Sequence, residues 1–202
     1  MQTVLRQCRP AITSMLVMTV LLGLLYPLAI TGIGQVAFPF QANGSLLKSA
    51  NGTVVGSALI GQEFTAARYF HSRPSATLST ATTPAPQPYN AANSGASNLG
   101  PTNKTLITTV AQRAAAYRTE NHLAPNAPVP VDAVTASGSG LDPDISPANA
   151  ALQAPRVAQA RGLPLATVQA LVTRYTTGRT FDILGEPRVN VLRLNQALDA
   201  AK

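Results

Sequence analysis

The feature that most constrains this chain is a long stretch without charged side chains near its N-terminus. No Asp, Glu, Lys or Arg occurs between Arg9 and Lys48, and residues 11–34 within this stretch are almost entirely apolar. A helix of about 20 apolar residues crosses the roughly 30 Å hydrocarbon core of a bilayer. The few polar side chains here are hydroxyls, which can bond to carbonyls of their own helix. The sequence therefore predicts a transmembrane helix over residues 11–34.

A buried core helix and a cleaved signal peptide are the alternatives to a membrane anchor. A buried core helix would be shorter and less uniformly apolar in a chain of 202 residues. A cleaved signal peptide has an apolar region of about 7–15 residues that ends in a small-x-small site. The stretch is longer than that, and Gln35-Val36-Ala37 matches such a site poorly. The sequence therefore favours an uncleaved membrane anchor.

The charges on either side of the anchor predict its orientation. Arg6 and Arg9 precede it, and the next positive charge is Lys48. The positive-inside rule then places residues 1–10 in the cytoplasm and residues 35–202 in the periplasm or outside the cell. We expect a single-pass protein of the inner or plasma membrane, in contact with lipid. The only cysteine precludes an intrachain disulfide.

A proline and two glycines mark one part of the predicted span. Pro27 lacks a backbone N–H and favours a kink, while Gly23 and Gly32 leave room for another helix to approach. Together with Tyr26, these residues are the candidate packing face for a partner helix. The alternative is a tolerated proline without such a role.

Residues 35–202 are expected to form one mixed α+β domain, because helical and strand patterns do not alternate regularly. The apolar spacing, caps and breakers predict helices at 104–121, 146–161 and 164–176, strands within 52–62, 129–134 and 188–194, and a terminal helical turn or two at 195–201. Pro155 is expected to kink or break its helix. Tyr69 and Phe70 are expected to be buried together.

A long uncharged segment, residues 74–103, is rich in Ser, Thr, Pro, Ala and Asn. This composition predicts an irregular loop, and loops of this length are usually functional or disordered. We expect disorder over residues 78–88 and an ordered polar surface over residues 89–101.

The sequence contains none of the common catalytic motifs, and a single cysteine excludes a cysteine-based zinc site. A triad of Ser139 with a histidine and an aspartate is conceivable, but Gly138-Ser139-Gly140 is more typical of a tight turn. Asp142 and Asp144 could form a cation site or an acid/base pair, although turn and capping roles are favoured. We predict no catalytic residue, no metal site and no cofactor of the chain's own.

The chain is basic, with a net charge of +7 from 15 Lys+Arg against 8 Asp+Glu. Two predicted helices joined at Gly162 are similar to a helix-turn-helix in a DNA-binding protein. The predicted orientation places them outside the cytoplasm, and the arginines are spread rather than clustered. We therefore expect no nucleic-acid partner.

Nearly the whole chain resembles the KdpC family, the C subunit of the bacterial Kdp potassium-transporting ATPase. The matching stretches, in the family's order, are residues 24–27 (LLYP), 56–62 (GSALIGQ), 69–70 with 73–76, 89–90 with 94–101 (SGASNLGP), 128–147, 156–163 (RVAQARGL) and 184–195 (LGEPRVNVLRLN). Three positions depart from the usual pattern. Asp144 and Tyr175 stand where the family usually has histidines, and Ala96 where it usually has a glycine.

The resemblance implies a non-catalytic accessory subunit that stabilises a potassium-import complex and raises the ATP affinity of its ATPase subunit. The implied partners are a channel-like potassium-binding subunit, a P-type ATPase subunit and a small single-span subunit, and ATP and K⁺ are handled by the complex. The predicted orientation favours an external cap beside the potassium entrance. The alternative is a membrane-anchored exported binding module or hydrolase unrelated to transport.

Three groups of candidate site residues follow from this resemblance and the orientation. The candidates for nucleotide contact are Ser137, Gly138, Ser139, Gly140 and Gln153. The candidates for attracting cations are Asp142, Asp144, Asp132 and Glu63, whose field is screened within about 8 Å at physiological salt. The candidates for a partner surface in the polar loop are Ser94, Asn98 and Gly100.

Overall fold

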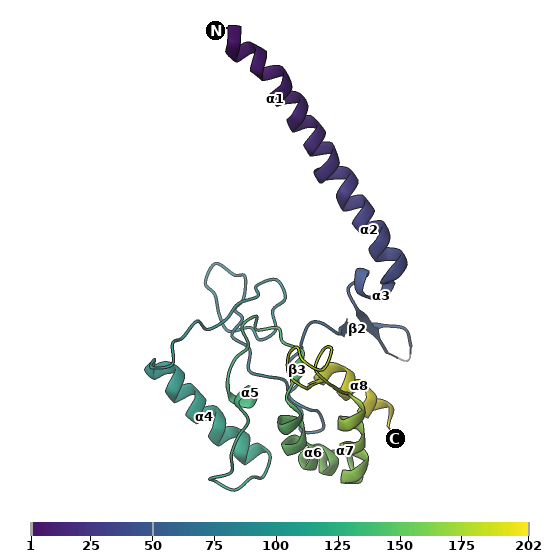
Figure 1. The fold of residues 1–202 in the computed structure, drawn as a ribbon. Helices are drawn as coiled ribbons and strands as arrows, with labels where there is room; N and C mark the ends of the chain where they lie inside the picture. Colours follow the sequence, from purple (N-terminus) through teal and green to yellow (C-terminus); the bar gives the residue numbers. More distant parts are fainter. Residues whose placement is uncertain (1, 50, 202) are drawn as a thin grey trace. The chain divides into compact units, whose positions relative to one another are not determined.

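The computed structural model describes residues 2–49 and 51–201 and separates them into two compact units (Figure 1). The N-terminal unit ends at Leu46. The second unit begins at Leu47 and is called the outer unit after the location that the sequence predicts for it.

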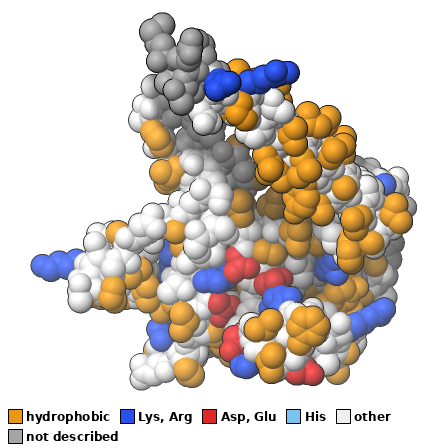
Figure 2. All heavy atoms as spheres, turned by 45° about the horizontal axis from the view of Figure 1, so that its top comes forward, with side chains coloured by type: hydrophobic (Ala, Val, Ile, Leu, Met, Phe, Trp, Pro, Cys, Tyr) orange, Lys and Arg blue, Asp and Glu red, His pale blue; other side chains and the backbone are white. Residues whose placement is uncertain are grey.

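The N-terminal unit is dominated by one continuous helical stretch. It comprises α1 (Gln2–Val20), the π-helical segment η1 (Leu21–Leu25) and α2 (Tyr26–Ala37), followed by the short α3 (Pro39–Ala42). From Arg6 to Ala37 this stretch is long and apolar enough to cross a membrane, with a mean hydropathy of 2.2. None of the residues in its most apolar part is buried within the chain. Figure 2 shows hydrophobic side chains gathered along it. The predicted apolar helix is confirmed.

The predicted disturbance at Pro27 takes the form of a π-helical turn. The N–H of Tyr26 bonds to the carbonyl of Leu21, five residues earlier, and Pro27 stands in the first turn of α2. A proline ring clashes with the carbonyl four residues before it, and a π-turn is one of the ways in which a helix accommodates such a disturbance. The helix therefore continues through the proline instead of ending there.

Five helices belong to the described part of the outer unit: α4 (Lys104–Glu120), α5 (Val131–Val134), α6 (Pro147–Arg161), α7 (Leu165–Arg174) and α8 (Val191–Ala200). The side chain of Asn103 caps α4, and that of Ser146 accepts the N–H of Asn149 at the start of α6. Gly162 ends α6 with a φ of 65°, a left-handed conformation that suits glycine. These predicted helix ends are confirmed.

The described residues also form two small sheets. Strands β1 (Leu46–Lys48) and β2 (Val54–Ser57) form one, and β3 (Asp144–Ile145), β4 (Thr176–Thr177) and β5 (Arg188–Asn190) form the other. In the three-stranded sheet β5 is central and antiparallel to both neighbours, pairing Val189 with Ile145 and with Thr176. The chain then passes directly from β5 into α8.

The core lies where α6, α7 and α8 meet β5. Its buried side chains are Phe70, Ile145, Ala150, Ala154, Val157, Ala158, Val168, Val172, Val189, Val191, Leu194 and Leu198. Half-buried Tyr175 packs against the same cluster. The mixture of helices and short antiparallel strands around one core confirms the α+β fold class.

Several local predictions were wrong. Residues 129–134 were expected to form a strand, but residues 131–134 form α5. The strand expected over 188–194 ends at Asn190, whose side chain caps α8 by accepting the N–H of Arg193. Val191, Leu194 and Leu198 are buried at helical spacing, which favours a helix over continued alternation. Within residues 52–62, where one or two strands were expected, the structure has β2, and this prediction is confirmed.

The burial of some side chains also differs from what the sequence predicts. Helix α6 continues unbroken through Pro155, which lies on its exposed side. Ile107 in α4 and Leu165 in α7 are apolar but exposed. Phe70 is fully buried, whereas Tyr69 beside it is only half-buried.

The segment 78–88, expected to be disordered, is a closed turn in the structure. Leu78 and Pro86 form a bridge, and the N–H of Ser79 donates to the carbonyl of Ala85 at 2.8 Å.

Candidate functional site

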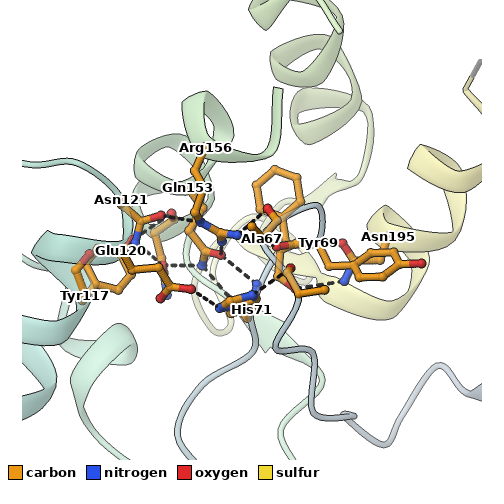
Figure 3. A network of polar contacts seen from close by, with 12 residues as sticks. Ala67, Tyr69, His71, Tyr117, Glu120, Asn121, Gln153, Arg156 and Asn195 are labelled. Atoms are coloured by element: carbon orange, nitrogen blue, oxygen red, sulfur yellow. Dashed lines mark hydrogen bonds and ion pairs between the residues drawn. The ribbon is translucent and has the colours of Figure 1, made fainter. Parts of the chain in front are cut away.

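Polar side chains of the outer unit meet around Gln153 in α6 (Figure 3). Its side-chain oxygen accepts the N–H of His71 at 2.7 Å and an N–H of Arg156 at 2.9 Å. Its side-chain nitrogen donates to the carbonyl of His71 at 3.1 Å and to the side chain of Asn149 at 2.8 Å. Both lone pairs and both N–H groups of this buried amide are thus used within the chain. Gln153 therefore fastens the segment around His71 to α6.

Arg156, one turn further along α6, is 5% exposed. It donates to Asn121 at 3.0 Å, to the carbonyl of Ala67 at 2.6 Å and to the carbonyl of Tyr69 at 3.1 Å. Burial lowers the pKa of its guanidinium, an effect that the negative charge of Glu120 opposes. Arg156 therefore links the end of α4 and the segment 67–69 to the core helix.

His71 connects this network to a carboxylate. Its Nδ1 lies 2.8 Å from a carboxylate oxygen of Glu120, and its Nε2 lies 3.1 Å from the carbonyl oxygen of Ala66. Both ring nitrogens therefore face oxygen atoms that can accept a hydrogen bond. The hydrogen bond from His71 is the main cause that lowers the pKa of Glu120, while burial opposes it.

A cavity of about 370 Å³ lies beside this network, between α4 and the segment 63–75. Arg113 lines it with a pKa that burial lowers, and donates to the carbonyl of Val134 at 3.2 Å. Arg73 also lines it and forms an ion pair with Asp142, while its buried Nε has no partner among the described residues. The recess can admit a small polar molecule, but most of its charged groups already engage other groups of the chain.

The candidate cation-attracting residues fall into different environments. Asp142 lies 2.8 Å from Arg73 and accepts the N–H of Asp144 at 3.0 Å. Asp144 lies 3.3 Å from Arg188 and accepts a hydrogen bond from Asn190, and burial raises the pKa of its carboxyl. Acidic side chains lie among basic ones on the face of the outer unit in Figure 2.

Asp132 and Glu63 differ from this pair and from each other. Asp132 accepts the N–H and the hydroxyl of Ser146 at 2.8 and 2.9 Å, and the side chain of Asn149 at 2.9 Å. These contacts hold α5 to the start of α6. Glu63 lines the cavity and has no ion pair or side-chain hydrogen bond with any described residue. Of the four candidates, Glu63 is therefore the carboxylate most available to a cation.

The turn Ser137–Gly140 binds its own neighbours. The N–H of Gly140 donates to Ser137 Oγ at 2.9 Å, and Ser139 Oγ accepts the N–H of Leu141 at 3.1 Å. Gly140 has a φ of 68°, and a Cβ there would lie 2.5 Å from the side chain of Thr77. Within the described part of the chain, Ser139 forms no hydrogen bond with a histidine. The turn and Gln153 thus belong to separate hydrogen-bonded groups. Within the turn, Gly138 and Ser139 are exposed.

Part of the polar loop is attached to this turn. Ser94 Oγ and the N–H of Gly95 both donate to the carbonyl of Ser139, at 3.0 and 2.9 Å. Asn98 and Gly100 are exposed, and Asn98 has a φ of 52°. The structure therefore brings one candidate for the partner surface together with the turn and leaves the other two at the solvent.

The candidate helix-packing residues lie on an open surface of the N-terminal unit. Gly23, Tyr26, Pro27 and Gly32 are all exposed within this chain. A Cβ at Gly32 would meet no atom within 4 Å, and one at Gly23 would meet only Thr19 at 4.0 Å. This surface has space for a second helix.

Sequence reasoning missed most of the central network. Asn149, Gln153 and Arg156 recur at spacings of four and three on the side of α6 that also carries Ala150, Ala154 and Val157. Polar residues repeating on the apolar side of a helix are a signal that could have found them. Asn195 accepts the N–H of Phe70 at 2.8 Å and donates to the carbonyl of Phe70 at 2.9 Å. No such repeat of polar residues in the sequence indicates this role of Asn195.

A family model described as "KdpC: K+-transporting ATPase, c chain" matches residues 8–200. The chain belongs to the KdpC family. This confirms the resemblance, because the match includes both the apolar helix and the outer unit. The network around Gln153 is therefore part of a KdpC fold.

Named KdpC relatives are similar to this chain over almost their full length. A "Potassium-transporting ATPase KdpC subunit" of Mycobacterium tuberculosis is 57% identical over 194 residues, which cover 96% of this chain and 98% of the relative. Proteins with the same name from Caulobacter vibrioides and Bradyrhizobium diazoefficiens are each 57% identical, covering 97% and 98% of this chain and 94% and 98% of the relatives.

Proposed function

We propose that this chain is a non-catalytic accessory subunit of an ATP-driven potassium-import complex, with its outer unit as an external cap beside the potassium entrance. Family membership over residues 8–200 carries the role in transport. The charge asymmetry of the anchor supports the external position, because Arg6 and Arg9 precede the helix and no charge follows it until Lys48.

The chain promotes ATP binding by the ATPase subunit through assembly, without touching the nucleotide. An outer unit on the far side of the membrane from cytoplasmic ATP has no direct route to it. The bonding of Gln153 supports this view, because its buried amide has no free donor or acceptor for a nucleotide. ATP and K⁺ are ligands of the complex in this proposal.

The partners are a channel-like potassium-binding subunit, a P-type ATPase subunit and a small single-span subunit. The exposed Gly23 and Gly32 offer a surface on the anchor against which a helix of one of these subunits can pack closely.

Replacement of both glycines by Leu is expected to weaken co-purification of the other subunits from membranes. Thr13→Leu, on another exposed part of the helix, is the control. Unchanged co-purification of the double variant would contradict this packing role.

The cap position is tested through Glu63, the unpaired carboxylate among the cation candidates. In the assembled complex, Glu63→Gln is expected to raise the potassium concentration for half-maximal ATPase activity by about twofold, without changing the maximal rate, because removing one screened charge changes local cation concentration modestly. Asp199→Asn, which alters a carboxylate elsewhere on the outer unit, is the control. An unchanged potassium dependence of Glu63→Gln would contradict the cap position.

A further inference from the structure

The hairpin between β4 and β5, residues 178–187, presents apolar side chains to solvent. Phe181 is 83% exposed, Ile183 73% and Leu184 57%. Elsewhere in the outer unit Phe70 is fully buried, and Phe64 packs against the core. Three large apolar side chains clustered at one exposed tip are typical of an interaction site.

The hairpin is held in shape by its own contacts. Thr180 and Leu184 exchange two backbone hydrogen bonds, each 2.9 Å long. Below this pair, Arg179 donates to both carboxylate oxygens of Glu186 at 2.8 and 2.7 Å. The base continues into the pairing of Thr177 with Arg188. An element already ordered before contact loses little conformational entropy when it docks.

The tip also adopts an unfavourable backbone conformation. Phe181 and Asp182 have φ values of 54° and 61°, in the left-handed region where a bulky aromatic residue is rare. Glycine would suit the turn better if folding were its only role. A strained, exposed aromatic residue therefore points to a role in binding.

The charge at the tip narrows the choice of partner. Of the eight side-chain carboxylates, only Glu63 and Asp182 lack an ion pair or side-chain hydrogen bond with a described residue. Asp182 stands between Phe181 and Ile183 in the sequence. Insertion of this tip into a bilayer would carry an unpaired carboxylate into hydrocarbon or towards anionic lipid headgroups, which is costly. A protein pocket can supply apolar walls and a cation or N–H donor together.

We propose that the hairpin docks into an apolar pocket of another subunit of the transport complex, whose rim carries a Lys, Arg or backbone N–H group that meets Asp182. This inference rests on the proposed function of the chain as a complex subunit. Phe181 and Ile183 supply the apolar anchor, and Asp182 sets the orientation of docking through its charge.

Photo-crosslinking in the assembled complex tests the contact directly. A photoreactive phenylalanine analogue at position 181 of the full-length chain is expected to crosslink to another subunit. The same analogue at Gln159, an exposed position on α6, is the control and is expected not to do so. Crosslinking at position 181 to lipid alone or to a second copy of this chain, or no crosslinking at all, would overturn the proposal.

Substitutions separate this proposal from the wider function. Phe181→Ser combined with Ile183→Ser is expected to lower recovery of the other subunits by about tenfold, the loss typical of removing an interface anchor, and Asp182→Asn by less. Ile107→Ser changes an exposed apolar residue on α4 and is the control. A thermal-unfolding midpoint no lower than that of the unaltered chain excludes misfolding as the cause.

The two proposals fail in different ways. If the unaltered chain co-purifies with the other subunits and the double variant does so equally well, docking by the hairpin is wrong and the accessory role stands. If the unaltered chain itself does not co-purify with them, the accessory role is wrong and the hairpin proposal falls with it.

Discussion

The polar loop of residues 74–103 and the hairpin of residues 178–187 are both irregular segments of the outer unit, yet they relate to the rest of the chain in opposite ways. The loop is long, uncharged and polar, and many of its polar groups bond within the chain. The hairpin is short, and its apolar side chains contact solvent. Loop length and composition therefore do not identify the segment that is free to meet a partner.

The hydrogen bonds of the loop show how it is retained. Thr77 donates to the carbonyl of Gln87 at 2.6 Å and accepts the N–H of Asn90 at 3.1 Å. Ser75 donates to the carbonyl of Gly140 at 2.8 Å, which connects the loop to the turn. Hydrogen bonds between short hydroxyl side chains and backbone groups thus hold this loop in place, where a sheet would use pairing between backbones.

The largest expected effect belongs to the buried network that retains the segment 67–71. Arg156→Ala removes four hydrogen bonds and takes this donor from buried Asn121 and Gln153 and from the carbonyls of Ala67 and Tyr69. We expect a loss of about 3–5 kcal/mol in the free energy of unfolding. Denaturant titration of the full-length protein in detergent measures it. The exposed Arg174→Ala should change stability by less than about 0.5 kcal/mol, and equal effects of the two variants would refute the role of the network.

The attachment of the polar loop to the turn predicts a smaller effect. Gly140→Ala forces a Cβ into a left-handed backbone, 2.5 Å from Thr77 and 2.8 Å from the carbonyl of Gly95. The expected loss is about 1–3 kcal/mol. Gly138→Ala is the matched control, because a Cβ there meets no atom within 4 Å. If thermal unfolding responds equally to both substitutions, the loop is not attached through this turn.

The tip of the hairpin predicts a change of opposite sign. Phe181→Gly relieves the left-handed strain and removes a side chain that the chain itself does not bury. We expect the free energy of unfolding of the purified chain to rise by up to about 1 kcal/mol, with the greater freedom of glycine in the unfolded state offsetting part of the gain. Loss of stability, seen as a lower midpoint in denaturant, would show that this chain does use Phe181 in its own folding.

The smallest expected effect is the dependence of stability on pH at Glu120. The pKa of this carboxyl is lowered in the folded state, chiefly by the hydrogen bond from His71. The stability that the Glu120 carboxylate contributes to the folded state is therefore fully present above the pKa of the unfolded state. This stability is lost as the pH falls through the pKa of the folded state, which lies below the ordinary value of 4.5. The stability difference between the unaltered chain and Glu120→Gln should shrink on acidification. A difference that is constant from neutral pH to about pH 3 would contradict this contribution.

Much of the fold could be predicted because its signals are local. The apolar helix, the cap at Ser146 and the left-handed end at Gly162 depend on residues close together in the sequence. The strand expected over 188–194 holds only for residues 188–190, because Val191 and the buried Leu194 and Leu198 follow a helical spacing.

The candidate site could be predicted only in part, because its contacts join distant segments. Gln153 is a candidate nucleotide ligand by sequence, but its partner His71 lies 82 residues away. Asp142 is a candidate by its charge, and no local pattern indicates that Arg73, 69 residues earlier, neutralises it. Tertiary packing, which a single sequence does not display, decides which polar groups stay free.

The external position of the outer unit is the central claim, and a topology reporter fused after Lys202 tests it most directly. A phosphatase that is active only outside the cytoplasm and a fluorescent protein that folds only inside it give opposite signals from the same fusion site. We predict high phosphatase activity and no fluorescence, because the positive charges at Arg6 and Arg9 favour a cytoplasmic N-terminus. Fluorescence without phosphatase activity would place the outer unit in the cytoplasm and contradict the proposed cap.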